Sequence, residues 1–186
     1  YEMSEETAFE IDEPTDWIII EQLMKKKSGT SSARNIRMLL TDCDGCLTDG
    51  GMYYSENGDE LKKFNTRDGM AFSLLRQKGI ITGIITGENV ELNRRRAEKL
   101  HIEELHMGVT DKLVVVERLA EKYGISLDEI AYIGDDINDI PVLKAVGLSC
   151  CPGDAVEDVK SVVDFVLKTR GGCGVIREVL SLIGSR

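Results

Sequence analysis

Residues 36–50, IRMLLTDCDGCLTDG, decide the fold of this chain. The first six residues are mostly apolar, as in strands that are buried on both faces of a parallel sheet. Carboxylates and glycines follow at once, so the strand is expected to end in a tight turn. In open α/β sheets, ligands bind beyond the carboxyl ends of the strands. The turn after Thr41 is therefore the first candidate for a functional site.

The same kind of apolar segment recurs along the chain and alternates with helical patterns. Apolar runs that suit buried strands lie at residues 80–86, 104–108, 130–134, 146–150 and 163–167. Helical patterns lie at residues 68–79, 91–100 and 111–124. The last of them has Asp111 as its N-cap and Gly124 as its stop. This alternation predicts an α/β fold, a doubly wound, Rossmann-like parallel sheet with helices on both faces.

Two segments fall outside the alternation. Residues 51–64, GMYYSENGDELKKF, carry Asn57-Gly58 between alternating residues, which predicts a small β-hairpin. Residues 1–35 are acidic at first and end in KKKSGTSSARN, a run typical of a flexible linker. We therefore expect a single domain over residues 36–186, preceded by a different segment over residues 1–35.

Composition limits the classes of function. The chain has 186 residues and a formal net charge of -10, which argues against a nucleic-acid partner because phosphate backbones are bound by Lys and Arg. No apolar run approaches the ~20 residues that span a bilayer, and no signal peptide is visible. We expect a cytoplasmic protein without a membrane partner. The five cysteines show no disulfide framework, and Cys43 and Cys46 are interpreted as small packed residues.

Chemically useful side chains follow four successive strands. They are Asp42 and Asp44 after the first, Thr86 and Glu88 after the second, Lys112 at the start of the helix after the third, and Asp135, Asp136 and Asp139 after the fourth. Carboxylates gathered at one edge of a sheet repel one another unless a cation lies among them. All-oxygen ligation suits Mg²⁺, so we expect Mg²⁺ as the cofactor.

These residue types indicate phosphoryl transfer. Asp42 is the candidate nucleophile, which would form an aspartyl-phosphate. Asp44 can protonate the leaving alkoxide and later deprotonate the attacking water. Thr86 and Lys112 are expected to hold phosphoryl oxygens, while the metal ion offsets their charge.

The ordered set DCDGCLTDG, TGE, a helix-opening Lys and GDDIND resembles the signature of haloacid dehalogenase superfamily phosphatases. The resemblance implies that Asp42 is the nucleophile, Asp44 the acid/base and Asp135 the metal carboxylate. It also implies Asp42 and the backbone carbonyl of Asp44 as metal ligands. Asp136 and Asp139 are expected to orient the metal's water shell instead.

Neither gap between the motifs has room for the lid that many members of this superfamily carry. The chain resembles the capless subgroup that dephosphorylates eight- and nine-carbon keto-sugar acids, through TDG-GMYY, KKFNTRDG, DKL and RGGCGVIRE. Members of that subgroup are tetramers in which hairpins pack together and neighbours complete each site. The resemblance therefore implies a phosphorylated sugar-acid substrate and a homotetramer.

Within the subgroup, Glu88 followed by a basic helix resembles the nine-carbon, sialic-acid-type enzymes, whereas eight-carbon enzymes typically carry Arg at that position. Glu88 can accept hydrogen bonds from sugar hydroxyls, and a cation can pair with the substrate carboxylate. The candidate cations are Arg96, Lys99, Arg170 and Arg177. A solvated helix face is the alternative interpretation for most of the run from Arg94 to Arg96.

The first 24 residues, YEMSEETAFEIDEPTDWIIIEQLM, resemble the closing segment of acylneuraminate cytidylyltransferases. This resemblance implies that the phosphatase belongs to a fused protein, with residues 1–35 as the tail of the transferase domain plus a linker.

Two alternatives to a nonulosonate 9-phosphate phosphatase stay open. One is a 3-deoxy-manno-octulosonate 8-phosphate phosphatase. The other is a non-catalytic module that tetramerises an attached cytidylyltransferase. The presence of every motif residue favours catalysis. His101 and His106 lie away from the carboxylate motifs and are expected to have surface or structural roles.

Overall fold

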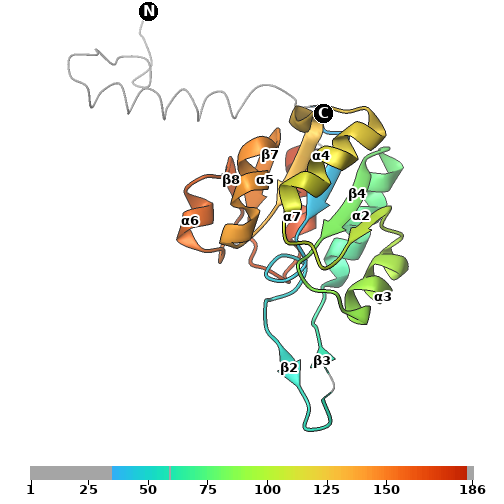
Figure 1. Ribbon diagram of the computed structural model, residues 1–186, viewed down its shortest axis with the longest axis vertical. Coiled ribbons are helices and arrows are strands. Elements are labelled where there is room, and N and C mark those ends of the chain that lie inside the picture. The colour runs from blue at the N-terminus through green and yellow to red at the C-terminus, as the bar shows by residue number, and fades with distance from the viewer. Residues whose placement is uncertain (1–34, 59, 184–186) are drawn as a thin grey trace, which may run out of the picture. The chain divides into compact units, whose positions relative to one another are not determined.

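The computed structural model describes residues 35–58 and 60–183, so the prediction for the segment before the phosphatase domain lies outside the described residues. Six strands form one sheet in the order β5-β4-β1-β6-β7-β8, and all its pairings are parallel. The strands are β1 Met38–Thr41, β4 Ile81–Ile85, β5 Glu104–His106, β6 Ile130–Ile133, β7 Leu148–Cys151 and β8 Phe165–Val166. The predicted doubly wound sheet is confirmed (Figure 1).

Strand β1 lies at the centre of the sheet, between β4 and β6. All four of its residues are fully buried. Leu39 packs into the core on one face, while Met38 and Leu40 pack into the core on the other. A strand with an apolar layer on each side needs apolar residues at successive positions, which explains why residues 36–41 lack alternation.

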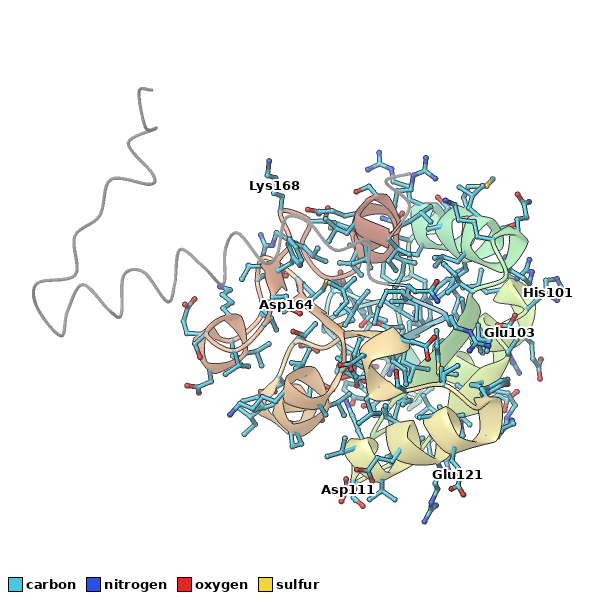
Figure 2. All side chains as sticks on the ribbon, turned by 90° about the horizontal axis from the view of Figure 1, so that it is seen from above. His101, Glu103, Asp111, Glu121, Asp164 and Lys168 are labelled. Carbon is cyan, nitrogen blue, oxygen red and sulfur yellow. The ribbon has the colours of Figure 1, made fainter. Side chains whose placement is uncertain are left out.

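Helices cover both faces of the sheet. The first layer contains α2 Thr66–Gln77, α3 Glu91–Leu100 and α7 Val175–Ile183. The second contains α4 Lys112–Tyr123, α5 Ile140–Ala145 and α6 Glu157–Lys160. Seen from above, α2 and α7 lie on one side of the strands and α4 on the other, with Asp111 and Glu121 on its outer side (Figure 2).

Helix α4 begins and ends as predicted. The side chain of Asp111 accepts a hydrogen bond from the backbone N–H of Val114, 3.3 Å away. Gly124 ends the helix with a left-handed φ of 60°, which glycine adopts without steric strain. The N-cap fixes where α4 starts, so Lys112 occupies the first helical position and lies at the carboxyl edge of the sheet.

Strand β7 begins later than the expected residue 146. Gly147 donates its N–H to the carbonyl of Leu127, 2.9 Å away, and a Cβ at this position would lie 1.9 Å from the carbonyl oxygen of Asp128. The chain before Leu148 therefore packs against the short 3₁₀ turn η2, Leu127–Glu129, instead of continuing the sheet ladder.

The predicted hairpin pairs β2, Tyr53–Tyr54, with β3, Glu60–Leu61. Its turn spans Ser55 to Gly58, where Gly58 has a φ of 84°. The hairpin extends away from the sheet (Figure 1), and Tyr54 and Leu61 are 68% and 63% exposed. Among the described residues between β1 and α2, β2 and β3 are the only helices or strands, so that segment carries no cap domain. In the described part of the chain, no helix is long and apolar enough to cross a membrane.

Candidate active site

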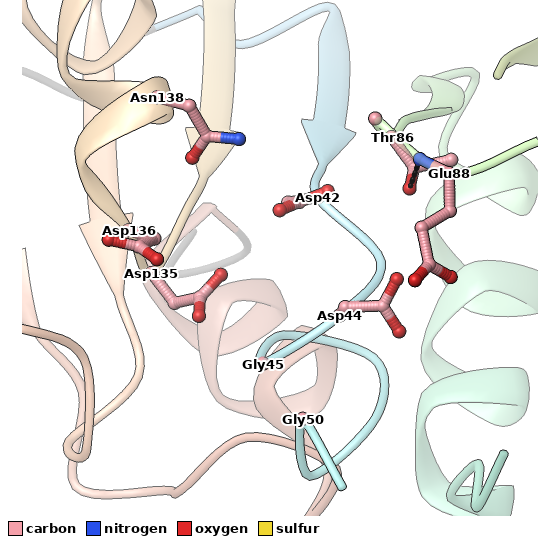
Figure 3. Close-up of a pocket in the computed structure, with 10 residues that line it drawn as sticks. Asp42, Asp44, Gly45, Gly50, Thr86, Glu88, Asp135, Asp136 and Asn138 are labelled. Atoms are coloured by element: carbon pink, nitrogen blue, oxygen red, sulfur yellow. Dashed lines mark hydrogen bonds between the residues drawn. The ribbon is translucent and has the colours of Figure 1, made fainter. Parts of the chain in front are cut away.

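The carboxyl ends of β1, β4 and β6 surround a pocket of about 320 Å³. Asp135 and Asp136 lie on one side of it and Thr86 and Glu88 on the other, with Asp42 between them (Figure 3). The lining residues are Asp42, Asp44, Gly45, Gly50, Thr86, Gly87, Glu88, Asp135, Asp136 and Asn138. Three of the four predicted motifs thus meet in one pocket, and the fourth reaches Asp42 through Lys112.

Asp42, the predicted nucleophile, directly follows β1 and is 7% exposed. Its Oδ1 accepts a hydrogen bond from the N–H of Cys43 at 2.7 Å, and its Oδ2 lies 3.0 Å from Lys112 Nζ. Burial and the nearby Asp139 carboxylate raise the pKa of Asp42 to about 6, against the opposing effect of Lys112. The carboxylate is therefore held in a fixed orientation, in surroundings that favour an added cation.

Lys112 is buried, and its Nζ also lies 2.7 Å from Asp139 Oδ1. Burial opposes its charge, but Asp42 and Asp139 outweigh burial and raise the pKa of Lys112. Lys112 thus stays an ammonium beside the nucleophile, where it can attract a phosphoryl oxygen.

Asp139 is completely buried and accepts four hydrogen bonds. Its Oδ1 accepts from Lys112 and from the hydroxyl of Tyr132, both at 2.7 Å. Its Oδ2 accepts from the backbone N–H groups of Asp135 and Asp136, at 3.1 and 3.4 Å. With these hydrogen bonds, Asp139 fixes the backbone of the loop after β6 and the position of Lys112. Tyr132 was not predicted, because every residue of β6 is buried and no polar alternation marks it.

The remaining carboxylates fit a hard divalent cation. Oxygen atoms of Asp42, Asp135 and Asp139 lie within 4.8 Å of one another. Burial, together with Asp42 and Asp139, raises the pKa of Asp135 to about 7. A cation among these groups would remove the repulsion, and oxygen donors suit Mg²⁺. Because Asp139 is already engaged, Asp42 and Asp135 are the carboxylates left to bind it. The Asp44 carbonyl stays a predicted ligand.

Gly45 allows the catalytic turn to approach Asp135. A Cβ at this position would lie 1.9 Å from Asp135 Oδ2, and the residue has a φ of 76°. Only glycine fits both the space and the backbone conformation. Steric exclusion therefore explains why the D-x-D-G pattern ends in glycine at residue 45.

Asp44 is held by a lysine that the sequence analysis did not single out. Lys62 Nζ donates to both carboxylate oxygens of Asp44 at 2.8 Å and also to Glu88 Oε2. Thr48 Oγ1 adds a hydrogen bond of 3.2 Å to Asp44 Oδ1. Two lysines adjoin in KKF, and nothing in the pattern distinguishes Lys62 from Lys63.

Thr86 ends up buried just beyond β4, on the pocket wall. Its Oγ1 accepts a hydrogen bond from the N–H of Glu88 at 3.2 Å (Figure 3). The hydroxyl hydrogen is then available for an acceptor in the pocket, which is consistent with the predicted phosphoryl contact.

Four predicted substrate-binding cations are not among the described residues that line this pocket. Arg96 donates from Nη2 to the carbonyl of Asn65 at 2.7 Å and lies over the ring of Phe64. Arg170 pairs through Nε with Asp154 at 3.0 Å. Lys99 and Arg177 are exposed on α3 and α7. Their predicted roles would require a contact with substrate outside the pocket of their own chain.

Comparisons with known proteins agree with this geometry. A model of haloacid dehalogenase-like hydrolases matches residues 98–179. The chain is 40% identical over 153 residues to 3-deoxy-D-manno-octulosonate 8-phosphate phosphatase KdsC of Escherichia coli K12, with 82% of this chain and 81% of the relative covered.

Solved structures give the same result. The crystal structure of the Yersinia pestis 8-phosphate phosphatase superposes with a TM-score of 0.79 at 41% identity, covering 81% of this chain and 82% of that one. The Moraxella catarrhalis enzyme, crystallised with magnesium, phosphate and KDO, gives a TM-score of 0.79 at 38% identity, covering 81% and 87%. The chain therefore belongs to the haloacid dehalogenase-like hydrolases and is a KdsC-type phosphoric monoester hydrolase without a cap domain.

Proposed function

We propose that this phosphatase removes the 9-phosphate of a sialic-acid-type nonulosonate, N-acylated or deaminated, with Mg²⁺ and through an aspartyl-phosphate at Asp42. One observation carries the chemical part of the proposal. Asp42 lies between Asp135, which can hold the metal ion, and Lys112, and it faces a pocket whose other wall carries Asp44 and Glu88.

The pocket residues allow phosphate hydrolysis in two steps, phosphorylation of Asp42 and hydrolysis of the aspartyl-phosphate. An Asp42 oxygen bonds to phosphorus as the bond to the sugar oxygen breaks, and Asp44 gives that oxygen a proton. Water then displaces Asp42 from phosphorus while Asp44 takes its proton, which releases phosphate and restores both groups. Lys112 and Thr86 hold the nonbridging oxygens. Bound at Asp42 and Asp135, Mg²⁺ would offset their negative charge.

Glu88 supports the nine-carbon substrate. It lines the pocket, and Figure 3 shows its carboxylate pointing toward Asp44. One Glu88 oxygen accepts from Lys62, which leaves lone pairs of the carboxylate for sugar hydroxyls.

The eight-carbon substrate is the second candidate, and the relatives favour it. The matched phosphatases of Escherichia coli, Yersinia pestis and Moraxella catarrhalis are named for 3-deoxy-D-manno-octulosonate 8-phosphate. The two substrates share a phosphorylated keto-sugar acid, so the same catalytic residues would serve both.

A homotetramer would close the open pocket. The exposed side chains of Met52, Tyr53, Tyr54 and Leu61 gather on the hairpin, and apolar surface of this kind marks an interaction site. Neighbouring chains could then supply Arg96, Lys99, Arg170 or Arg177 to the substrate carboxylate. Light scattering coupled to size-exclusion chromatography measures the oligomeric state, and a monomer at micromolar concentration would contradict the assembly.

Residues 1–35 support the setting in sialic acid biosynthesis through their resemblance to a cytidylyltransferase end. In a fused protein of that kind, dephosphorylation would precede activation of the sugar acid.

The test is phosphate release from three substrates side by side: N-acetylneuraminate 9-phosphate, its deaminated analogue and 3-deoxy-manno-octulosonate 8-phosphate. Each is assayed with Mg²⁺ and with EDTA. Asp42→Asn serves as the inactive variant. Asp49→Asn is the matched control, because Asp49 lies on the same loop but does not line the pocket.

Turnover that requires Mg²⁺ and Asp42, and that favours a nine-carbon substrate, is the expected result. Preference for the eight-carbon substrate would replace the first candidate with the second. Absence of release from all three, with a folded tetramer, would favour the non-catalytic module that the sequence analysis left open.

A further inference from the structure

Lys62 contacts two acidic side chains, Asp44 from the turn after β1 and Glu88 from the turn after β4. Its side chain is fully buried, and its ammonium contacts both oxygens of Asp44 and one oxygen of Glu88. An ammonium has three protons, so all of its donors are engaged within the protein. Lys62 therefore has no free donor for a substrate, and its role must be exerted through the two carboxylates.

Asp44 needs such a partner. It lies in the turn after β1, where its side chain is 28% exposed and also accepts a hydrogen bond from Thr48. Asp44 and Glu88 would also repel each other if no cation lay between them. A contact to both oxygens of Asp44 fixes its rotation as well as its position.

The backbone of Lys62 is itself fixed on both sides. It directly follows Leu61 of β3, which pairs with Tyr53 in the hairpin. Two residues later, Phe64 forms an antiparallel bridge with Thr48 of the catalytic turn. Strand β3 and the bridge at Phe64 thus place the Lys62 ammonium beside Asp44.

We propose that Lys62 is the positioning residue of Asp44, and that Glu88 acts on Asp44 by anchoring Lys62 as well as by facing the substrate. The inference rests on the proposed acid/base role of Asp44. Glu88 then has two effects, one on substrate choice and one on the chemical steps for any substrate.

A substrate without a sugar separates these effects. p-Nitrophenyl phosphate has an acidic leaving phenol, so transfer of its phosphoryl group to Asp42 does not depend on a proton from Asp44. Hydrolysis of the aspartyl-phosphate still requires Asp44 to take a proton from water. Loss of Asp44 positioning should therefore slow the second step more than the first.

The experiment compares Lys62→Met, Lys62→Arg and Glu88→Gln with Lys63→Met, all with Mg²⁺, by stopped-flow detection of p-nitrophenolate. Lys63 is the matched control because its ammonium pairs with Asp49 at the surface, 2.8 Å away. For Lys62→Met we expect a burst of one phenolate per active site, followed by a steady rate lower by about 10- to 100-fold.

Lys62→Arg should recover part of the steady rate, because a guanidinium can bind both oxygens of a carboxylate. Glu88→Gln should give the same burst pattern with a smaller fall. Circular dichroism melting checks that each variant is folded. If Lys62→Met does not fold, the kinetics of Lys62→Arg and Glu88→Gln decide the test.

Three results would overturn the proposal. The first is a steady rate for Lys62→Met within twofold of that for Lys63→Met. The second is loss of the burst together with turnover in a folded variant, which would place Lys62 in the phosphorylation step. The third is a Glu88→Gln variant whose aryl phosphate kcat is unchanged. Because the probe contains no sugar acid, an error in the proposed substrate leaves this test unaffected.

Discussion

Lys112 and Asp139 form a buried ion pair, with 2.7 Å between Nζ and Oδ1, although 27 residues separate them in the chain. Tyr132 donates to the same oxygen from β6 at 2.7 Å. Lys112 is thereby aligned toward Asp42, whose Oδ2 lies 3.0 Å from its Nζ. The position of the cation beside the nucleophile depends on a tyrosine that does not itself line the pocket.

Tyr132→Phe should therefore affect both stability and activity. Loss of a buried hydrogen bond to a charged group should lower the free energy of unfolding by about 1.5–3 kcal/mol. Since Lys112 loses part of its alignment, kcat should fall while the enzyme stays folded. Urea denaturation and steady-state kinetics measure the two effects. Tyr123→Phe removes a tyrosine–carboxylate hydrogen bond to Glu104, outside the site, and should leave kcat unchanged.

Mg²⁺ should stabilise the protein through Asp135. A ligand that binds only the folded state at 100 times its Kd raises the free energy of unfolding by about 2.7 kcal/mol. Differential scanning calorimetry with Mg²⁺ and with EDTA should show a higher Tm with the metal. The difference should vanish in Asp135→Asn and persist in Asp49→Asn. An equal gain in all three proteins would locate the metal elsewhere.

The buried Asp68 should make stability depend on pH. Its Oδ1 accepts from the N–H of Ile176 at the start of α7, and burial raises its pKa from 3.8 to about 6. The folded state then binds a proton that the unfolded state has lost, so wild type gains stability as pH falls through 6. Relative to Asp68→Asn, that gain should be about 1 kcal/mol between pH 7 and 5.

The measurement for Asp68 is a pair of urea titrations at each pH. Glu104→Gln is the comparison, because hydrogen bonds from Lys122 and Tyr123 hold the pKa of Glu104 below 4.5 despite its burial. Its stability difference should stay constant over the same range. A constant difference for Asp68→Asn as well would contradict the buried, proton-binding carboxyl.

Gly171→Ala should disable the enzyme through the catalytic turn. A Cβ at residue 171 would lie 2.0 Å from the carbonyl oxygen of Gly45 and 3.0 Å from that of Thr48. Relief of that overlap should cost about 1–3 kcal/mol of stability and displace Asp44, so kcat should fall at least about tenfold. Gly124→Ala meets open space, although its φ is 60°. It should lose stability by a similar amount and keep its kcat.

Local patterns predicted much of this structure because local physics decides it. The N-cap of α4, the glycine that ends it and the apolar β1 each depend on a few adjacent residues. The order of the motifs then placed Asp42, Thr86 and Asp135 at one edge of the sheet, since parallel strands share a carboxyl end.

Long-range pairing was not predicted, for a physical reason. Lys62 meets Asp44 and Glu88 from 18 and 26 residues away, where the path of the hairpin determines which of two adjacent lysines turns inward. The hydrogen bonds of Asp139 could not be predicted for the same reason, because its four donors come from α4, from β6 and from the loop after β6. The roles of Arg96, Lys99, Arg170 and Arg177 stay predictions.

The close approach of Gly171 to Gly45 joins the segment before α7 to the first motif. Gly172 also donates its N–H to the carbonyl of Cys46 at 2.9 Å, so residues 171–172 support the turn that carries Asp44. During synthesis on a ribosome, the nucleophile emerges long before this support does. A nascent chain would acquire activity only once the segment that leads into α7 has left the ribosome, so the onset of catalysis would show that translation has passed residue 172.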